Sequence, residues 1–293
     1  MERKMGEMDG KVVLITGATN GIGKVAALEL AKKGALVVIV GRSPAKTQAT
    51  VDEIKHASDN LSINGLVADL SSMAEVRKLA DEFRQQNSRL DVLINNAGAY
   101  FSNRQVSVDG FEMTFALNHL SYFLLTNLLI DLLKASAPSR IVNVASDAHN
   151  GAKLNFDDLQ NTKGYGGMGF SAYGQSKLAN ILFTYELARR LVNANVTVNA
   201  VHPGAVATGF GENNGGVMKL AMKVFHRFAL TPEQGADTLI YLASSPEVTG
   251  ITGKYWEKRK AINSSAVSYD EADQKRLWEM SAQMVGLAAP ATS

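Results

Sequence analysis

The sequence predicts an α/β fold in which one doubly wound parallel sheet of about seven strands carries helices on both faces. Short apolar runs rich in β-branched residues alternate along the chain with helical patterns, and such strand–helix–strand units imply parallel strands. A glycine-rich turn separates the first run from the first helical pattern. The length of 293 residues, with 46% hydrophobic and 20% charged residues, suits one large globular domain.

The expected elements follow one another regularly. Residues 1–10 form a polar N-terminal extension, and residues 11–293 form the domain. Strands are expected at 11–16, 35–40, 61–67, 91–95, 139–145, 196–201 and 252–256. Helices are expected near 21–33, 44–57, 72–87, 110–135, 171–193, 231–243 and 270–284.

Two irregular stretches, about 147–170 and 206–230, follow the fifth and sixth strands. Open α/β sheets bind ligands at the carboxyl ends of their strands, so both stretches are expected to wall a substrate site. The second stretch carries apolar side chains that suit either a lid over a hydrophobic molecule or a helix packed on the domain. These are Phe210, Met218, Leu220, Met222, Phe225 and Phe228.

The first strand, turn and helix form an expected anion site. The apolar run 11–16 leads into the turn 17–23, GATNGIG, and then into a helical pattern. Free N–H groups and the positive end of the helix dipole attract a phosphate there, and glycines let it approach. The spacing differs from G-x-G-x-x-G, and glycines can also serve only the turn. The predicted phosphate contacts are Gly17, Thr19, Asn20, Gly21, Ile22 and Gly23.

The second strand ends in Gly41-Arg42-Ser43, and this ending bears on the cofactor. In a dinucleotide-binding unit an acid here binds the ribose 2′-hydroxyl of NAD, whereas an arginine accommodates the 2′-phosphate of NADP. Arg42 with no neighbouring carboxylate predicts NADP(H). Asn20 and Lys46 are expected to add contacts to that phosphate, and a solvated helix face is the alternative for Lys46.

Tyr173 and Lys177 lie four residues apart in a helical pattern and so share one face of the helix. A nearby cation favours the phenolate and lowers a tyrosine pKa from its ordinary value of about 10. Such a pair can exchange a proton with an alcohol or carbonyl oxygen. A surface pair on an amphipathic helix has the same spacing, so the motif needs support from elsewhere in the chain.

That support comes from the order of the motifs. The turn 16–23, then Asn95-Asn96-Ala97-Gly98, Ser146 and Tyr173-x-x-x-Lys177 make residues 10–286 resemble the classical short-chain dehydrogenase/reductase family. The resemblance implies a Rossmann-type fold with strand order 3-2-1-4-5-6-7. The segments 110–120, 177–180 and 272–287 resemble the branch that contains retinol dehydrogenases, WW-domain oxidoreductases and light-dependent protochlorophyllide reductases.

The resemblance also implies roles for four catalytic residues. Ser146 would donate to the substrate oxygen, and Tyr173 would be the acid in reduction and the base in oxidation. Lys177 would lower the Tyr173 pKa and hold the nicotinamide ribose. Asn118 would bind, through its main chain, a water that joins Lys177 to solvent.

Further cofactor contacts are carried over in the same way. Asp69 would bind the adenine amine, with a helix N-cap as its alternative role, and His202 is expected to be structural. The other implied cofactor contacts are Leu70, the backbone of Asn95, Ala97 and Gly98 at the adenosine ribose, and Pro203, Gly204, Val206 and Thr208 at the nicotinamide.

The predicted function is NADP(H)-dependent hydride transfer to or from a hydrophobic carbonyl or alcohol, such as a retinal-like compound, lipid aldehyde or ketone. One alternative is an NADP(H)-sensing protein without turnover, since fold does not fix function. Another is reduction of a conjugated C=C bond, as in protochlorophyllide reductases. Those enzymes are associated with an active-site cysteine, and this sequence has none.

Composition limits the partners. Thirty basic and 28 acidic residues leave a net charge of +2 and predict no nucleic-acid partner. The lack of cysteine excludes disulfides and thiolate metal sites, and no metal site is expected. A polar start and an apolar stretch 120–133 too short to span a bilayer predict a soluble, cytoplasmic protein.

A homodimer is expected through the helices at 110–135 and 171–193, which carry more apolar side chains than one stripe needs. The side chains concerned are Phe115, Leu117, Phe123, Leu124, Leu128, Ile181, Leu182, Phe183 and Leu187.

Overall fold

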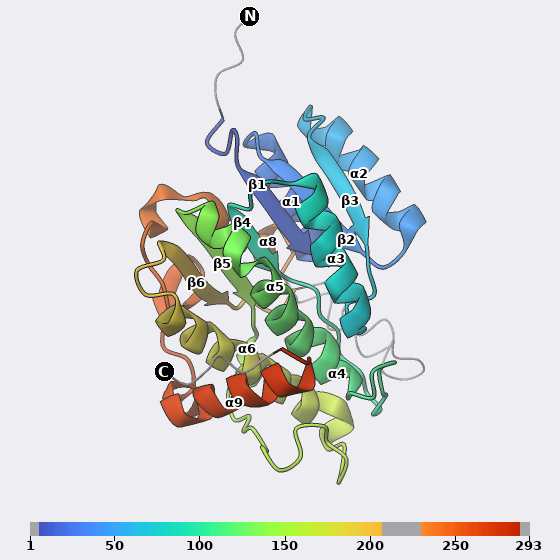
Figure 1. Ribbon diagram of the computed structural model, residues 1–293, viewed down its shortest axis with the longest axis vertical. Helices are drawn as coiled ribbons and strands as arrows, with labels where there is room; N and C mark the ends of the chain where they lie inside the picture. The colour runs from blue at the N-terminus through green and yellow to red at the C-terminus, as the bar shows by residue number, and fades with distance from the viewer. Residues whose placement is uncertain (1–5, 207–229, 288–293) are drawn as a thin grey trace, which may run out of the picture.

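The computed structural model describes residues 6–206 and 230–287 and contains a twisted eight-stranded sheet with helices on both faces (Figure 1). The strand order is β3-β2-β1-β4-β5-β6-β7-β8, which confirms the predicted order for the first seven strands. These seven are parallel, and their apolar β-branched residues are buried between the helical layers. The strands are β1 (Val12–Thr16), β2 (Leu36–Gly41), β3 (Ile63–Val67), β4 (Val92–Asn95), β5 (Ser139–Val144), β6 (Val196–Val201), β7 (Lys254–Glu257) and β8 (Lys260–Ile262).

Strand β8 was not predicted. It runs antiparallel to β7 through a two-residue turn in which Lys258 and Arg259 have φ of +48° and +59°. Both central residues of such a hairpin turn need positive φ, and Asn-Gly or Asp-Gly is the usual signal. Lys-Arg gives no such signal, and the three exposed residues of β8 show no apolar pattern.

The helices divide into two layers. Helices α1, α2 and α8 pack on one face, and α3, α5, α6 and α9 pack on the other, each layer with its own apolar core. The longer helices are α1 (Gly21–Lys32), α2 (Pro44–Ser58), α3 (Met73–Gln86), α5 (Ser121–Ala135), α6 (Phe170–Arg190), α8 (Pro232–Ser244) and α9 (Glu271–Met284). The short helices are α4 (Met113–Phe115), the π-turn η1 (Ala116–Leu120) and the 3₁₀ turns η2 (Asp147–His149), η3 (Gly167–Gly169), η4 (Pro246–Val248) and η5 (Ala266–Tyr269).

The helix expected from residue 110 begins at Met113, because the buried Glu112 carboxylate accepts the N–H groups of Thr114 and Phe115 and so caps it. The helix then widens into the π-turn η1 before α5. The whole stretch Met113–Ala135 has 23 residues, a mean hydropathy of 1.3 and an apolar window that is 67% buried. By length and composition it could span a bilayer, a test that a mostly buried core helix also passes, so the expectation drawn from 120–133 stays a prediction.

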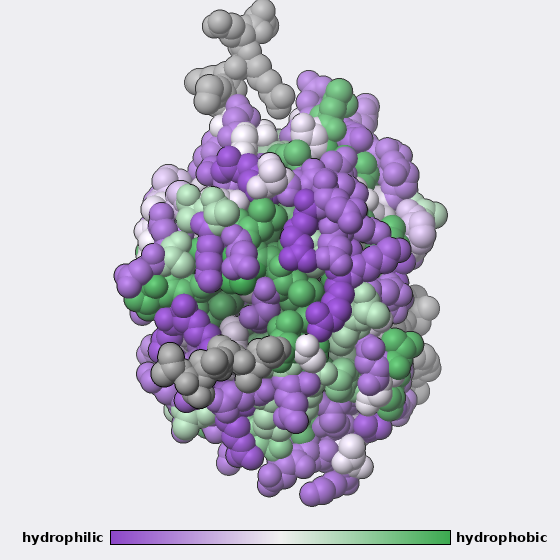
Figure 2. All heavy atoms as spheres, viewed as in Figure 1, coloured by the Kyte–Doolittle hydropathy of each residue, from purple (hydrophilic) through white to green (hydrophobic). Residues whose placement is uncertain are grey.

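Helix α9 covers the face between α5 and α6. Its Trp278 ring packs 4.9 Å from that of Phe123 and 5.8 Å from that of Phe183, and Arg190 lies 4.2 Å above the Trp278 ring. Of the apolar side chains that suggested a homodimer, only Leu117 and Leu128 are partly exposed. Figure 2 shows apolar side chains among polar ones on this side of the molecule. The homodimer stays a prediction.

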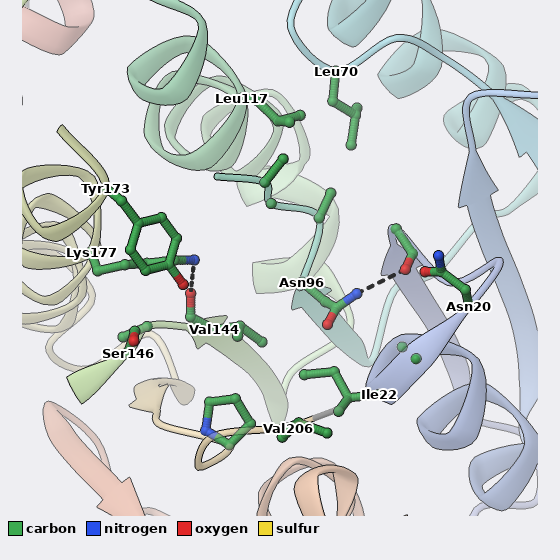
Figure 3. A pocket seen from close by; sticks show the side chains of 18 of the residues that line it. Asn20, Ile22, Leu70, Asn96, Leu117, Val144, Ser146, Tyr173, Lys177 and Val206 are labelled. Atoms are coloured by element: carbon green, nitrogen blue, oxygen red, sulfur yellow. Dashed lines mark hydrogen bonds between the residues drawn. The ribbon is translucent and has the colours of Figure 1, made fainter. Parts of the chain in front are cut away.

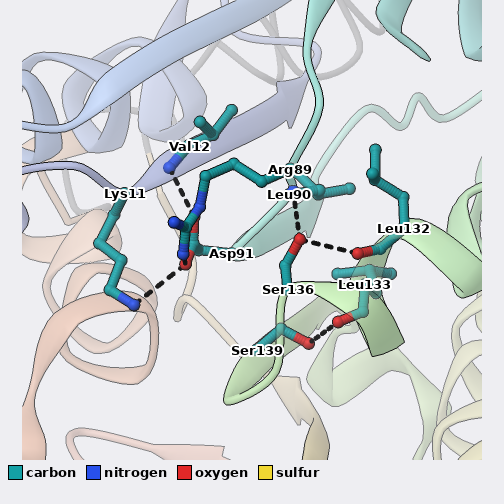
Figure 4. A network of polar contacts seen from close by, with 9 residues as sticks. All are labelled: Lys11, Val12, Arg89, Leu90, Asp91, Leu132, Leu133, Ser136 and Ser139. Atoms are coloured by element: carbon teal, nitrogen blue, oxygen red, sulfur yellow. Dashed lines mark hydrogen bonds and ion pairs between the residues drawn. The ribbon is translucent and has the colours of Figure 1, made fainter.

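Polar contacts tie the amino ends of the central strands together (Figure 4). The Asp91 carboxylate is almost fully buried and accepts hydrogen bonds from the Val12 N–H, the Lys11 ammonium and the Arg89 guanidinium. Nearby, the Ser136 hydroxyl accepts the Leu90 N–H and donates to a helix carbonyl. These bonds fix β1 against β4, and hence the turn that follows β1 at its other end.

Asp91→Asn should destabilise the protein by about 2–3 kcal/mol at neutral pH, because it leaves buried donors without a charged acceptor. Burial raises the Asp91 pKa, but Arg89, the Val12 N–H and Lys11 together lower it below its ordinary value. A lowered folded-state pKa gives stability above the unfolded pKa of about 4 that is lost as pH falls further. Urea unfolding at pH 7 and pH 3 should therefore show the deficit shrinking in acid. Asp81→Asn, in an exposed pair with Arg84, is the control and should change stability by less than about 0.5 kcal/mol. An equal deficit at both pH values would contradict the role of the charge.

Candidate active site

A cleft of about 590 Å³ lies at the carboxyl ends of the parallel strands. It holds most of the predicted site residues, and Figure 3 shows their side chains converging on it from both halves of the sheet. The predicted residues that line it are Gly17, Thr19, Asn20, Gly21, Ile22, Gly23, Arg42, Asp69, Leu70, Ala97, Gly98, Ser146, Tyr173, Lys177, Pro203, Gly204 and Val206.

The glycine turn forms a cradle at one end of the cleft. Gly17 has φ of +64°, and a Cβ added there would lie 2.7 Å from the Ala97 Cα. The N-cap residue of α1, Asn20, makes no side-chain capping bond, and the first turn of the helix carries no acid. The N–H groups at this helix end are therefore open to an anion. The arrangement fits the pyrophosphate of a dinucleotide.

Asn96 holds the turn in place, a role that sequence reasoning missed. Its amide nitrogen donates to the carbonyls of Thr16 and Gly17 at 2.7 Å and 3.0 Å. The Thr16 hydroxyl in turn accepts the N–H groups of Asn96 and Ala97. The pair Asn95-Asn96 at the end of β4 was the available sequence signal, but only Asn95 was predicted to be a site residue.

Asn95 points the other way. Its side chain is fully buried and donates to the Thr126 hydroxyl and to the side-chain amide oxygen of Asn143, outside the cleft lining. Successive side chains at a strand end face opposite sides, so only one of the two asparagines can face the turn. The direction of its side chain does not test the ribose contact expected of the Asn95 backbone, which stays a prediction.

Arg42 and Asp69 line the cleft after β2 and β3, whereas Lys46 is exposed and lies outside the lining. The Asp69 carboxylate accepts the N–H and hydroxyl of Ser71, and Ser72 rather than Asp69 caps α3. The N-cap alternative for Asp69 is therefore wrong. Lys46 lies on a solvated face of α2, which was the alternative predicted for it.

Asn118 lies behind the cleft and does not line it. Its side chain accepts the Ala99 N–H at 2.9 Å and donates to the Ala99 carbonyl and to the Ser176 hydroxyl, both at 3.0 Å. It thus joins the loop after β4 to α6, on which Tyr173 and Lys177 lie. The π-turn places this buried side chain between the two.

Tyr173, Lys177 and Ser146 meet in the cleft at the carboxyl end of β5, away from the glycine turn (Figure 3). The Lys177 ammonium donates to the Val144 carbonyl at 3.0 Å and lies 5.6 Å from the centre of the Tyr173 ring. Tyr173 and Ser146 share a side-chain hydrogen bond. The Ser146 hydroxyl also accepts the Ala148 N–H at 3.2 Å.

Burial dominates the protonation of this pair. It raises the Tyr173 pKa to about 12, against the lowering effect of the Ser146 hydrogen bond, and it lowers the Lys177 pKa to about 7. The expected depression of the Tyr173 pKa by Lys177 is therefore reversed, because both groups lose water and the cation bonds to a carbonyl. At neutral pH the phenol keeps its proton and can act as an acid.

The outer part of the cleft is apolar and was not predicted in detail. Tyr100, after β4, packs its ring 4.8 Å from that of Phe170 and edge-on to Tyr173. The cleft is lined here by Phe101, Met113, Leu117 and Phe170. Thr208 and the predicted apolar set from Phe210 to Phe228 lie outside the described residues. The described residues on either side of this gap, Val206 and Leu230, pair in an isolated parallel β-bridge.

Comparison with known proteins agrees with this geometry. The family model for short chain dehydrogenase matches residues 11–157 and 159–216. Retinol dehydrogenase 14 of Homo sapiens is 44% identical over 299 residues, which cover 96% of this chain and 88% of that protein. A crystal structure of an uncharacterised protein from Mycobacterium paratuberculosis aligns with a TM-score of 0.77 and 31% identity over 96% of each chain. The Pseudomonas aeruginosa RhlG/NADP active-site complex aligns with a TM-score of 0.68 and 28% identity over 86% of this chain and 96% of that chain.

The short chain dehydrogenase model thus matches most of the sequence. The structure adds the strand order, the glycine cradle and the Tyr173–Lys177 pair beside Ser146. The chain belongs to the short-chain dehydrogenase family and is an oxidoreductase that acts on CH–OH and C=O groups.

Proposed function

We propose that the protein transfers a hydride between NADP(H) and a hydrophobic carbonyl or alcohol. The observation that carries this proposal is that one cleft is lined by the glycine cradle, by the Ser146–Tyr173–Lys177 cluster and by an apolar outer wall. A protein that only sensed the cofactor would not need the proton-transfer groups in this arrangement. A cofactor at one end and an apolar substrate at the other fit the same space.

Different residues along the cleft would bind the cofactor and transfer the proton. The turn 17–23 would hold the pyrophosphate, and Lys177 would hold the nicotinamide ribose. When bound, the cofactor supplies or accepts the hydride. Ser146 would donate to the substrate oxygen while Tyr173 gives up its proton, which it retains at neutral pH. The acid role suits reduction of a carbonyl.

Two features support the finer assignments. Arg42 follows β2 at the cleft border, where a 2′-phosphate would lie, and one structural relative is an NADP complex. The apolar outer wall of Phe101, Met113, Leu117 and Phe170 suits a hydrophobic molecule, and close relatives in sequence are named retinol dehydrogenases. We therefore place retinal-like compounds, lipid aldehydes and ketones in the substrate class.

A panel of aldehydes tests the proposal. Turnover of propanal, decanal and all-trans-retinal is followed with NADPH by the loss of reduced-nicotinamide absorbance, or for retinal by product chromatography. We expect kcat/KM to be higher for decanal and retinal than for propanal, because the larger molecules bury more apolar surface. Cofactor binding without turnover of any aldehyde, ketone or alcohol would favour the sensing alternative instead.

Arg42→Ala should reduce the preference for NADP(H) over NAD(H) by roughly one to two orders of magnitude, since a hydrogen bond to a charged group contributes about 1.5–3 kcal/mol. The measurement is kcat/KM with each cofactor for wild type and variant. Lys46→Ala is the matched control, because Lys46 is a cation on the next helix outside the cleft and should leave the ratio unchanged. Equal use of both cofactors by the wild type would overturn the NADP(H) assignment.

A further inference from the structure

Two backbone hydrogen bonds close the turn that carries Ser146: the His149 N–H donates to the Ser146 carbonyl at 3.2 Å, and the Asn150 N–H donates to the Asp147 carbonyl at 2.9 Å. Ser146 lies two residues beyond the end of β5 at Val144, in extended conformation with φ of −162°, and the turn continues as the three-residue 3₁₀ segment η2. The turn lies against α6, where a Cβ added at Gly174 would come within 2.7 Å of the Ala148 carbonyl oxygen. Gly174 adjoins Tyr173, so any shift of the turn moves Ser146 relative to Tyr173.

His149 binds this turn from inside the protein. The ring is fully buried, and its Nδ1 lies 2.7 Å from the Ser146 carbonyl oxygen. Its Nε2 accepts the Ser265 N–H at 3.0 Å. A backbone N–H can only donate, so Nε2 carries no proton, and the neutral ring must bear its proton on Nδ1 and donate it to Ser146.

His202 binds Asp147, the next residue of the same turn, from the end of the neighbouring strand β6. It follows β6, and its Nδ1 accepts the Asp147 N–H at 3.1 Å. The backbone N–H of His202 donates to the Trp256 carbonyl in β7 at 2.9 Å, which holds the His202 backbone against the sheet. By the same reasoning Nδ1 of His202 carries no proton, and the neutral ring bears its proton on Nε2.

We propose that His149 and His202, in opposite neutral tautomers, form a clamp that positions Ser146 against Tyr173, and that protonation opens the clamp by breaking the bond from the Asp147 N–H to His202 and the bond from the Ser265 N–H that anchors the His149 ring. Both are positioning residues: each holds main-chain atoms of the turn and neither transfers the substrate's proton. Each ring uses one nitrogen as an acceptor for a backbone N–H, and a protonated nitrogen cannot accept. The consequence for turnover rests on the proposed function, whereas the clamp itself does not.

The surroundings set where the clamp opens. Burial lowers the pKa of both rings from the ordinary 6.5, while the nearby Asp147 carboxylate acts in the opposite direction on both. Glu257 also raises the His202 pKa, and Lys258 and His149 lower it. Tyr255 meets His149 edge-on at 4.9 Å. Both histidines are therefore neutral at pH 7, and the clamp opens as pH falls below 6.5.

Nitrogen NMR of the histidine rings tests the clamp without any substrate. We expect the proton of His149 on Nδ1 and that of His202 on Nε2 at pH 7.5, with assignments made from His149→Ala and His202→Ala. On acidification each ring should gain its second proton below pH 6.5. His56, exposed on α2, is the reference. A proton on Nε2 of His149, or on Nδ1 of His202, would overturn the clamp.

Kinetics test its effect on the reaction, with NADPH and the panel aldehyde of highest kcat/KM. Each alanine variant should lose about tenfold in kcat, as expected for one hydrogen bond, with NADPH affinity nearly unchanged. His202→Asn should restore most of that loss and flatten the acid limb of the pH–kcat profile, because its amide oxygen accepts the Asp147 N–H without titrating. His56→Ala should leave kcat and the acid limb of the pH–kcat profile unchanged. An unchanged kcat and acid limb in His202→Ala, with the NMR tautomers as expected, would overturn the positioning role but leave the proposed activity intact.

Discussion

Tyr173→Phe should abolish measurable turnover while the protein keeps its affinity for NADP(H). The substitution removes the hydroxyl that bonds with Ser146 and is placed to give a proton to the substrate oxygen. It leaves the glycine turn, Arg42 and Lys177 in place to hold the cofactor. Loss of general acid–base catalysis typically lowers the rate about 10²–10⁴-fold. Steady-state rates with the panel aldehydes and NADPH fluorescence titration measure the two effects separately.

Tyr122→Phe is a matched control, because it makes the same change beside the same lysine. The Lys177 ammonium lies 5.9 Å from the centre of the Tyr122 ring. The Tyr122 hydroxyl is buried without a hydrogen-bond partner among the described atoms, and the residue does not line the cleft. Its loss should therefore leave turnover intact. If Tyr173→Phe kept more than about a tenth of wild-type kcat, another group would have to supply the proton.

The parts of the fold set by local sequence were predictable. Runs of β-branched residues indicate the buried parallel strands, and the glycine cradle is formed by seven consecutive residues, 17–23. Strand β8 was missed because Lys258 and Arg259 take positive φ without a turn signal. The reach of α9 across α5 and α6 depends on Trp278 meeting Phe123 and Phe183, partners far away in the sequence.

The same distinction holds at the candidate site. Residues placed by the backbone at a strand end or helix start, such as Gly17 and Ser146, lie where the motifs put them. Side chains whose direction depends on tertiary neighbours were not predictable: Asn96 binds the glycine turn, a role that was not predicted, and Lys46 is exposed. The protonation of Tyr173 also departs from expectation, because spacing shows a nearby cation but not the burial of both groups.

Lys177→Met should remove turnover and weaken cofactor binding, yet stabilise the protein free of cofactor. The side chain is almost completely buried, which lowers its pKa to about 7, whereas an unfolded lysine titrates near 10.4. Below pH 7 the native protein must therefore keep a buried cation, at a cost on the order of 2–4 kcal/mol that methionine avoids. Between pH 7 and 10 the unfolded chain binds more protons than the native one, so wild-type stability rises with pH across this window.

Urea unfolding at pH 6 and pH 9 measures this effect in wild type and variant. The methionine variant should be the more stable at pH 6, and the difference should narrow at pH 9, where the native lysine has lost its proton. Lys78→Met is the control, because that ammonium is 75% exposed and should change stability by less than about 0.5 kcal/mol at either pH. A variant less stable than wild type at pH 6 would mean that the buried ammonium stabilises the fold. Lys177 would then be a structural cation rather than one kept, at the expense of stability, for the cofactor and the reaction.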